Sequence, residues 1–131
     1  MAAQQRPLSP HLSVYKLPMA ARLSILHRAT GCFLAIAAFG LALWLIAAAG
    51  SIEDYSRFQA CLRTWPAQLL MAAALFSFFL HLFTGIRHLF WDIGRGLELK
   101  SVLASNWVIV ALSLLGTAAY AWLAWNAGGA A

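Results

Sequence analysis

Hydrophobic residues in this chain are gathered into three long stretches that contain no charged residue. These stretches cover residues 29–50, 64–86 and 101–125. A helix that crosses the hydrocarbon core of a membrane needs about 20 mostly apolar residues at a rise of roughly 1.5 Å per residue, and each stretch exceeds that length. The pattern therefore predicts an all-α membrane protein with three transmembrane helices.

Helix-breaking and capping residues set the expected ends of these helices. Gly50 ends the first helix, and Thr64 is a candidate N-cap of the second. Helical spacing of the second helix continues beyond its uncharged core as far as Gly94. The expected helices cover about 22–50, 64–93 and 101–125, within a single membrane-anchor domain of residues 1–131. The proline-rich segment 1–21 is expected on the inner membrane surface, and the short loop 52–63 is expected to be partly helical.

Composition supports a membrane protein and excludes a soluble enzyme. Hydrophobic residues make up 63% of the chain, charged residues make up 10%, and the mean hydropathy is +0.76. Soluble domains contain roughly 45–50% apolar and about 25% charged residues, so this chain has too few charges to cover a surface that faces water.

The net charge of +5 reports membrane orientation rather than nucleic-acid binding. Only two cations, Arg57 and Arg63, lie in the first loop, beside Glu53 and Asp54. Cations on the opposite side of the membrane are Arg6, Lys16, Arg22, Arg28, Arg87, Arg95 and Lys100. By the positive-inside rule the N-terminus is expected inside and the C-terminus outside. Membrane lipid is the expected surrounding, and no nucleic-acid partner is expected.

The two cysteines are expected to be free thiols. Cys32 lies near the inner end of the first span and Cys61 lies in the outer loop. About 18 helical residues, or roughly 27 Å, separate their levels, whereas a disulfide requires Cα atoms within about 7 Å. The N-terminal residues carry no cleavable signal pattern and are a poor mitochondrial presequence, so we expect a bacterial inner membrane.

The first polar cluster lies where the first span enters the membrane. Ser24, His27, Arg28 and Gly31 fall within about one third of the helix circumference. In one interpretation the arginine is a snorkelling topology marker and the histidine an interfacial polar residue. In the other, a hydroxyl four residues from a fixed cation binds a carbonyl oxygen and stabilises negative charge that develops on it.

The second polar cluster lies on the second span. Relative to His81, the residues Gly85, His88 and Asp92 are rotated by about 40°, −20° and 20°, so they share one helix face, whereas Arg87 points elsewhere. His81 is either a buried neutral imidazole that donates to a backbone carbonyl or an axial haem ligand. The small Gly85 serves either the approach of a flat macrocycle or close helix packing.

Spacing limits how these histidines could serve a haem. His81 and His88 lie about 10 Å apart along the helix axis, so they cannot both ligate one iron. His88 fits a propionate partner better, together with His27 and Arg28. We expect His27 to lie roughly two turns closer to water than His81, which makes it a poor sixth ligand. A six-coordinate haem would therefore take its other ligand from another chain.

Other polar and aromatic residues leave alternatives open. Asp92 is either a solvated acid beside Arg95 or a partner that holds Arg28 in place. The tryptophans indicate an aromatic belt at the membrane interfaces, with pocket lining as the less favoured interpretation of Trp91. The six tryptophans are Trp44, Trp65, Trp91, Trp107, Trp122 and Trp125.

Three motifs in order along the chain resemble the cytochrome b membrane-anchor subunits of succinate dehydrogenase, respiratory complex II. They are RPLSPHL at residues 6–12, SILHRATG at residues 24–31 and HLFTGIRHLFWD at residues 81–92. The resemblance covers nearly the whole chain, including its length, spans and orientation. Residues 52–63 and 127–131 carry no motif of this family.

The resemblance implies a role for each matching residue. His81 matches the axial ligand of haem b, whose second ligand comes from the other anchor subunit. The positions of His27, Arg28 and His88 match those around the haem propionates. Ser24 and Arg28 match residues at the ubiquinone head-group site, with Asp92 near that arginine. No role is implied for Arg87 or His11.

The resemblance also implies partners. In the family, a flavoprotein with FAD oxidises succinate, and an iron–sulfur subunit passes the electrons to quinone beside the two anchor subunits. This chain would hold those soluble subunits at the inner membrane face and would not itself oxidise succinate. Two alternatives stay open: a non-redox membrane anchor or assembly protein, and the anchor of a quinol:fumarate reductase.

Overall fold

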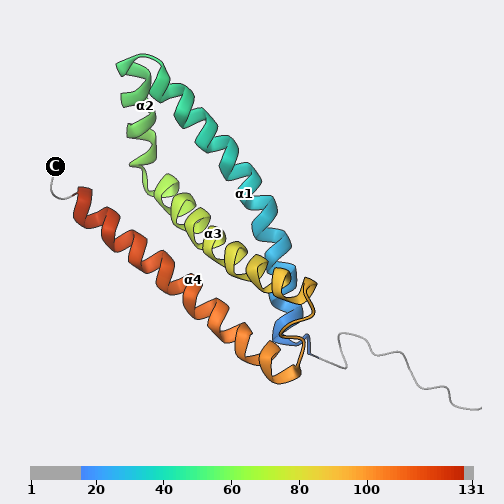
Figure 1. Cartoon of the computed structure of the whole chain (residues 1–131). Coiled ribbons are helices and arrows are strands. Elements are labelled where there is room, and N and C mark those ends of the chain that lie inside the picture. Colours follow the sequence, from blue (N-terminus) through green and yellow to red (C-terminus); the bar gives the residue numbers. More distant parts are fainter. Residues whose placement is uncertain (1–15, 129–131) are drawn as a thin grey trace, which may run out of the picture.

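The structure is a computed structural model that describes residues 16–128 and contains four α-helices (Figure 1). These are α1 (Met19–Ala49), α2 (Ile52–Leu62), α3 (Trp65–Asp92) and α4 (Leu99–Gly128). Three of them, α1, α3 and α4, are long and apolar enough to cross a membrane. The predicted all-α fold with three spans is confirmed. The motif at residues 6–12 and His11 lie outside the described residues, as does most of segment 1–21.

Helix α1 begins at Met19, three residues earlier than the sequence suggested. Pro18 has an extended backbone (φ −63°, ψ 156°) and occupies the N-cap position. Its carbonyl accepts hydrogen bonds from the backbone N–H groups of Ala21 (3.0 Å) and Arg22 (3.2 Å). A proline is tolerated immediately before a helix because its missing N–H would have no partner there.

The loop between the first two spans is almost entirely helical. Ser51 caps α2: its hydroxyl oxygen accepts from the Asp54 N–H (3.1 Å), and the same hydroxyl group lies 2.7 Å from the Asp54 carboxylate. Acidic residues in a first turn also suit the positive end of the helix dipole. Thr64 stands at the N-cap of α3 as expected, but its hydroxyl donates to the Cys61 carbonyl (2.7 Å) instead of capping the helix.

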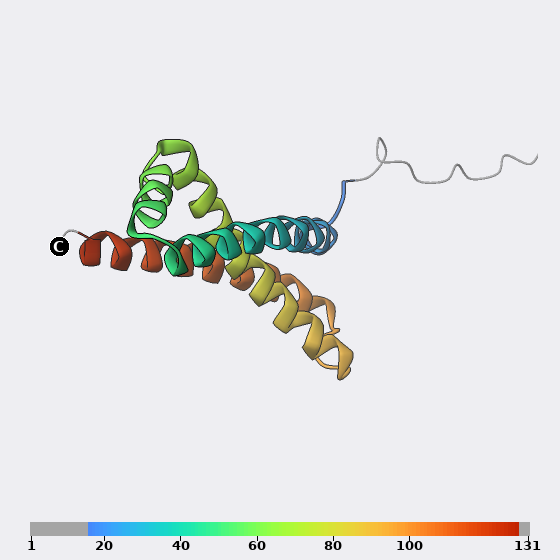
Figure 2. The ribbon, with the colours of Figure 1, turned by 90° about the horizontal axis from the view of Figure 1, so that it is seen from above.

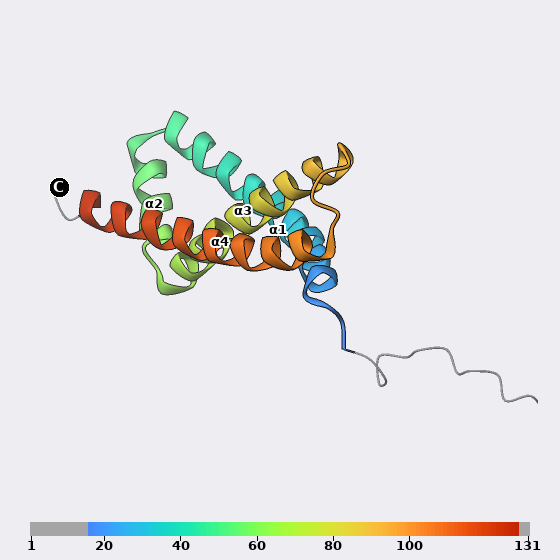
Figure 3. The same ribbon diagram turned by 60° about the horizontal axis from the view of Figure 1, so that its bottom comes forward.

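Helix α3 is the central element of the fold. It packs against both α1 and α4, which have few contacts with each other (Figure 1). Figure 2 shows that α3 is inclined to α1 rather than running alongside it, and Figure 3 shows the same crossing from another side. The crossing brings the C-terminal half of α3 against the N-terminal half of α1, which is the end that the cation distribution places inside.

Few apolar side chains are buried in the isolated chain. The core consists of Leu23, Leu80 and Ile109, whereas most large hydrophobic side chains are exposed on the outer faces of the helices. Among the buried residues in the part of the chain that the structure describes, polar side chains outnumber apolar ones. The polar ones are Thr30, Ser77, Thr84, Arg87, Asn106 and Ser113. Membrane helices commonly pack through small residues and polar bonds in this way, because lipid is as apolar as a leucine side chain. Cys32 and Cys61 are free, as predicted.

A glycine allows close packing between α3 and α4. A Cβ atom at Gly116 would lie 3.0 Å from two carbon atoms of the Phe79 ring. No side chain larger than hydrogen fits at this position without moving the ring. A Cβ atom at Gly40, on α1, would have open space around it in the described structure, so this glycine provides a matched control.

We expect Gly116→Leu to lower the free energy of unfolding of the detergent-solubilised protein by about 1–3 kcal/mol, because the new side chain overpacks the α3–α4 contact. Gly40→Leu adds the same side chain on an open face and should leave stability unchanged or slightly higher. Reversible unfolding in mixed detergent and SDS micelles measures both. Equal stability of the two variants would contradict the packing described here.

Candidate functional site

Two histidines stack where α1 crosses α3. The rings of His27 and His81 have centroids 4.0 Å apart and planes within 10° of each other. The ring of His88, further toward the inner end of α3, lies 5.1 Å from His27. Three of the predicted site residues, from two helices, are therefore gathered in one cluster, which we call the histidine cluster (His27, His81 and His88).

The expected depth of His27 was wrong. The centroids of His27 and His81 are 4.0 Å apart, so the rings differ in depth by less than one helical turn of roughly 5.4 Å, not by two turns. The number of residues along each span does not give the relative depth of two side chains on different helices. Here α3 is inclined to α1, and the two helices meet near these residues.

Glycines make room for the stacked rings. A Cβ atom at Gly31 would lie 3.0 Å from Cε1 of His81, and one at Gly85 would lie 3.7 Å from Cε1 of His27. Each helix thus presents a glycine to the imidazole of the other. Of the two interpretations of Gly85, close helix packing is the one that this contact supports.

Hydrogen bonds define which nitrogen of each stacked ring carries the proton. Nδ1 of His81 lies 3.0 Å from the backbone carbonyl oxygen of His27, which can only accept, so His81 donates through Nδ1–H. The Thr84 hydroxyl donates to the Leu80 carbonyl (2.5 Å) and accepts from Nδ1 of His27 (2.6 Å). Both rings are thereby held through Nδ1. In neutral His81 this leaves the lone pair on Nε2 available to a ligand or metal.

A second threonine supports the His81 ring from the α1 side. The Thr30 hydroxyl donates to the carbonyls of Leu26 (2.8 Å) and His27 (3.0 Å), and its oxygen lies 3.4 Å from Nδ1 of His81. Thr30 and Thr84 are both buried, and neither was singled out from the sequence as a site residue. Their signal was the spacing of each threonine three residues after a histidine on the same helix.

The other predicted residues, and His88 within the cluster, differ in exposure. Ser24 and His88 are half-buried, whereas Arg28 and Asp92 are exposed. The alternative in which Asp92 holds Arg28 is not seen, because within residues 16–128 neither side chain makes a hydrogen bond to the other. Exposed ion pairs contribute little energy, so the exposure of both groups leaves them available to another molecule.

The stacked histidines cannot both ligate one iron. The two axial ligands of a haem point their nitrogens at the metal from opposite sides. These two rings are instead stacked face to face with their planes nearly parallel, so their nitrogens do not point toward each other. Within the described part of the chain, no group of three or more histidine, cysteine or acidic side chains is arranged to hold a metal ion. A metal at His81 would therefore need ligands that these residues do not supply.

Arg87 is a buried residue to which the sequence assigned no role. It is 6% exposed, and its Nη1 donates to the side-chain oxygen of Asn106 on α4 (2.7 Å). Its guanidinium carbon also lies 4.7 Å from the centre of the Trp91 ring. The only sign of this pair in the sequence was one polar residue on each of two spans, Arg87 and Asn106, which face each other in the structure.

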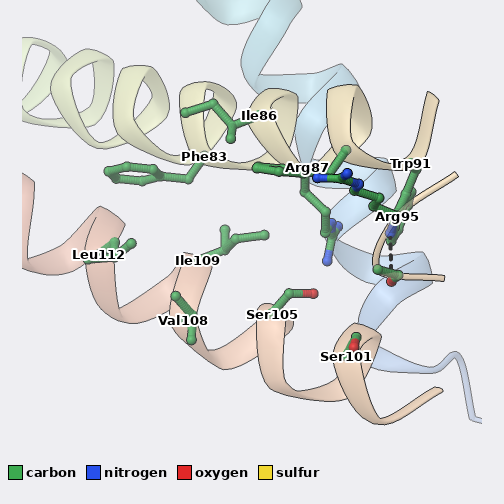
Figure 4. A pocket seen from close by; sticks show the side chains of 12 residues that line it. Phe83, Ile86, Arg87, Trp91, Arg95, Ser101, Ser105, Val108, Ile109 and Leu112 are labelled. Carbon is green, nitrogen blue, oxygen red and sulfur yellow. Dashed lines mark hydrogen bonds between the residues drawn. The ribbon is translucent and has the colours of Figure 1, made fainter. Parts of the chain in front are cut away.

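Trp91 lines a pocket between α3 and α4 (Figure 4). Pocket lining was the less favoured of the two interpretations of this residue, the other being the aromatic belt. The cavity has a volume of about 290 Å³ and is lined by Arg87 among other residues. Trp65, Trp107 and Trp122 are strongly exposed, as an aromatic belt requires.

Comparison with known proteins decides the family. Residues 2–120 match the family model described as "Succinate dehydrogenase/Fumarate reductase transmembrane subunit". The chain belongs to this family. The resemblance seen in the three motifs is confirmed.

Individual relatives support the same family. The succinate dehydrogenase cytochrome b556 subunit of Rickettsia felis is 44% identical over 113 residues, which cover 86% of this chain and 88% of the relative. The cytochrome b556 subunit of Paracoccus denitrificans is 37% identical over 110 residues, covering 84% and 85% of the two chains. The mitochondrial cytochrome b560 subunit of Mus musculus is 36% identical over 119 residues, covering 88% and 69%. With the three apolar helices, the bacterial relatives confirm the prediction of a multi-pass inner-membrane protein.

The bond between Thr84 and His27 can be tested by removing one hydroxyl. Thr84→Val keeps the side-chain shape but leaves Nδ1 of His27 without its acceptor, so we expect a loss of about 1 kcal/mol in the free energy of unfolding. The Nδ1–H resonance of His27 in ¹⁵N-histidine NMR spectra should shift as well.

Thr117→Val is the matched control for this change. The Thr117 hydroxyl also donates to a carbonyl four residues earlier, that of Ser113 (2.7 Å), but it is bonded to no other helix in the described structure. We expect Thr117→Val to change the free energy of unfolding little and to leave the His27 resonance unshifted. An unshifted resonance in Thr84→Val would contradict the hydrogen bond.

Proposed function

We propose that this chain is the cytochrome b membrane-anchor subunit of a succinate:quinone oxidoreductase. It would help to bind haem b, form part of the ubiquinone-reduction site and tether the flavoprotein and iron–sulfur subunits to the membrane. The observation that carries the proposal is the orientation of His81, whose Nδ1 is held by the His27 carbonyl while Nε2 is left for a metal.

The residues around His81 fit a haem ligand. Histidines that bind metals usually donate their other ring N–H to a carbonyl or a carboxylate, and this bond fixes the ring and strengthens its basicity. Here the backbone of α1 supplies that carbonyl, and Thr30 lies beside it. Gly31 leaves the space that the ring occupies. Haem b, when bound, supplies a centre that accepts and releases one electron at a time.

The second axial ligand is assigned to a partner subunit. His27 lies beside His81 rather than opposite it, and its Nδ1 is committed to Thr84. Three spans that leave most of their large apolar side chains exposed also form too small a bundle to enclose a porphyrin. A second anchor subunit that packs against this chain would supply both the ligand and the missing wall.

The inner end of the site suits the carboxylates of a haem. The propionates of a membrane haem extend toward water, and His27, Arg28 and His88 lie toward the end that the charge distribution places inside. With Nδ1–H of His27 bonded to Thr84, Nε2 of this ring would donate to a carboxylate only when the ring carries a second proton and is a cationic imidazolium. Arg28 is exposed and carries a permanent positive charge that would complement one.

Ser24 and Arg28 would bind the head group of ubiquinone. They are four residues apart on α1 and therefore share one face, with the serine half-buried and the arginine exposed. A hydroxyl and a guanidinium that both bond a quinone carbonyl would stabilise the negative charge that develops as electrons arrive. Asp92, exposed at the end of α3, would lie near that arginine and near the protons that reduction consumes.

The tethering role follows from charge and membership of the family. The inner side is expected to carry seven of the nine lysine and arginine residues, which would favour docking of soluble subunits there. Succinate oxidation would take place in the FAD subunit, and the iron–sulfur subunit would deliver electrons to the quinone. The family description also covers fumarate reductases, but the named relatives are succinate dehydrogenase subunits, which favours the succinate-oxidising direction.

His81→Ala tests the haem assignment. We expect the purified complex to lose its reducible b-type absorbance, because the imidazole whose Nε2 is left for the iron is removed. Leu82→Ala, at an exposed neighbouring position, is the control and should keep the spectrum. An unchanged spectrum in His81→Ala would favour the alternative of a non-redox anchor in which the histidines only pack and bond.

Ser24→Ala and Arg28→Ala test the quinone site. Each should reduce succinate:ubiquinone activity about tenfold or more, because a hydrogen bond to a developing charge is lost, while dye-linked succinate oxidation stays intact. Arg22→Ala, another inner arginine of α1, is the control and should preserve both activities. Equal loss of both activities in the site variants would indicate failed assembly and would argue against the assignment.

A further inference from the structure

The pocket between α3 and α4 has a polar end and an apolar end (Figure 4). Toward the inner ends of the two helices it is lined by the cations Arg87 and Arg95 and by the hydroxyl-bearing Ser105. Deeper in the membrane it is lined by Phe83, Ile109 and Leu112. Its volume of about 290 Å³ is large enough for part of an amphiphilic molecule.

Arg87 is only partly satisfied by its neighbours. Its Nη1 binds Asn106, but Nε and Nη2 are buried and have no hydrogen-bond partner within the described part of the chain. The Nδ2 atom of Asn106 is buried and unpartnered as well. A charge that is 94% buried is costly unless an opposite charge and further acceptors accompany it, and Arg87 bonds to no carboxylate within residues 16–128. The buried Arg87 guanidinium would therefore be stabilised by a bound anion.

We propose that this pocket binds an anionic phospholipid of the inner leaflet. Its phosphate would accept hydrogen bonds from Nε and Nη2 of Arg87 and would be neutralised further by Arg95. Its acyl chain would follow the apolar residues Phe83, Ile109 and Leu112. A guanidinium presents a planar fork that matches phosphate oxygens, and basic pockets between transmembrane helices on the inner side suit such head groups.

The pocket and His81 lie on different sides of α3, although Trp91, which lines the pocket, also packs edge-on against His88 with ring centroids 5.2 Å apart. Arg87 is six residues from His81, which places it about 120° away around α3. It faces Asn106 of α4, whereas His81 faces α1. A haem propionate on the histidine side would have to pass around α3 to reach this guanidinium. The lipid site thus does not depend on the haem or quinone assignments.

The test uses the intact complex purified in detergent together with its partner subunits. Native mass spectrometry would measure retention of added phosphatidylglycerol, with phosphatidylcholine as the uncharged comparison. We expect selective retention of phosphatidylglycerol by the wild type and a decrease of about tenfold or more in Arg87→Gln, because two charge-assisted hydrogen bonds are lost. Arg22→Gln, an arginine outside the pocket, should retain the lipid as the wild type does.

Two further variants decide the outcome if Arg87→Gln does not assemble. Arg87→Lys keeps the charge and should retain more phosphatidylglycerol than any neutral substitution. Val108→Trp fills the pocket from α4 without touching the guanidinium and should lower retention. The proposal is overturned if phosphatidylcholine is retained as well as phosphatidylglycerol, or if Val108→Trp and Arg87→Gln retain the lipid fully. Loss of haem absorbance in Arg87→Gln with lipid retained would overturn it in favour of a propionate.

Discussion

The close crossing of α1 and α3 is the contact on which the proposed redox site depends. Gly31 and Gly85 each leave room for the imidazole of the opposite helix, so the rings of His27 and His81 stack at 4.0 Å. The same approach brings the His27 carbonyl to Nδ1 of His81 and the Thr84 hydroxyl to Nδ1 of His27. One packing contact therefore sets the positions of both rings and the tautomer of each.

Polar side chains make many of the contacts that hold this chain together. A soluble domain of similar length would bury a large apolar core, but here the buried residues within 16–124 include more polar than apolar side chains. The hydroxyl groups of Thr30, Thr84 and Ser113 donate hydrogen bonds to carbonyls of their own helices, so these hydroxyl groups need no water as a partner. This arrangement suits an apolar surrounding such as lipid or detergent, where apolar outer faces need no covering and unsatisfied polar groups carry a large penalty.

Helix α3 separates two different environments. Its histidine side faces α1 and holds imidazoles by neutral hydrogen bonds, whereas its arginine side faces α4 and holds a charge with unfilled hydrogen-bonding capacity. His81 and Arg87 are about 120° apart around the helix and roughly 9 Å apart along its axis, so they face different partners. The proposed cofactor and the proposed lipid would thus be bound by one helix without competing.

The sequence by itself determined the three spans, the expected orientation, the polar faces of Ser24–Gly31 and His81–Asp92, and the resemblance to the family. These are properties of local composition and of spacing along single helices. Only the tertiary structure decided that His27 lies beside His81, that Thr84 and Thr30 support them, and that Arg87 meets Asn106 beside a pocket. The reason is physical: the inclination of one helix to another depends on where small residues permit close approach, and that geometry is not contained in the periodicity of either helix alone.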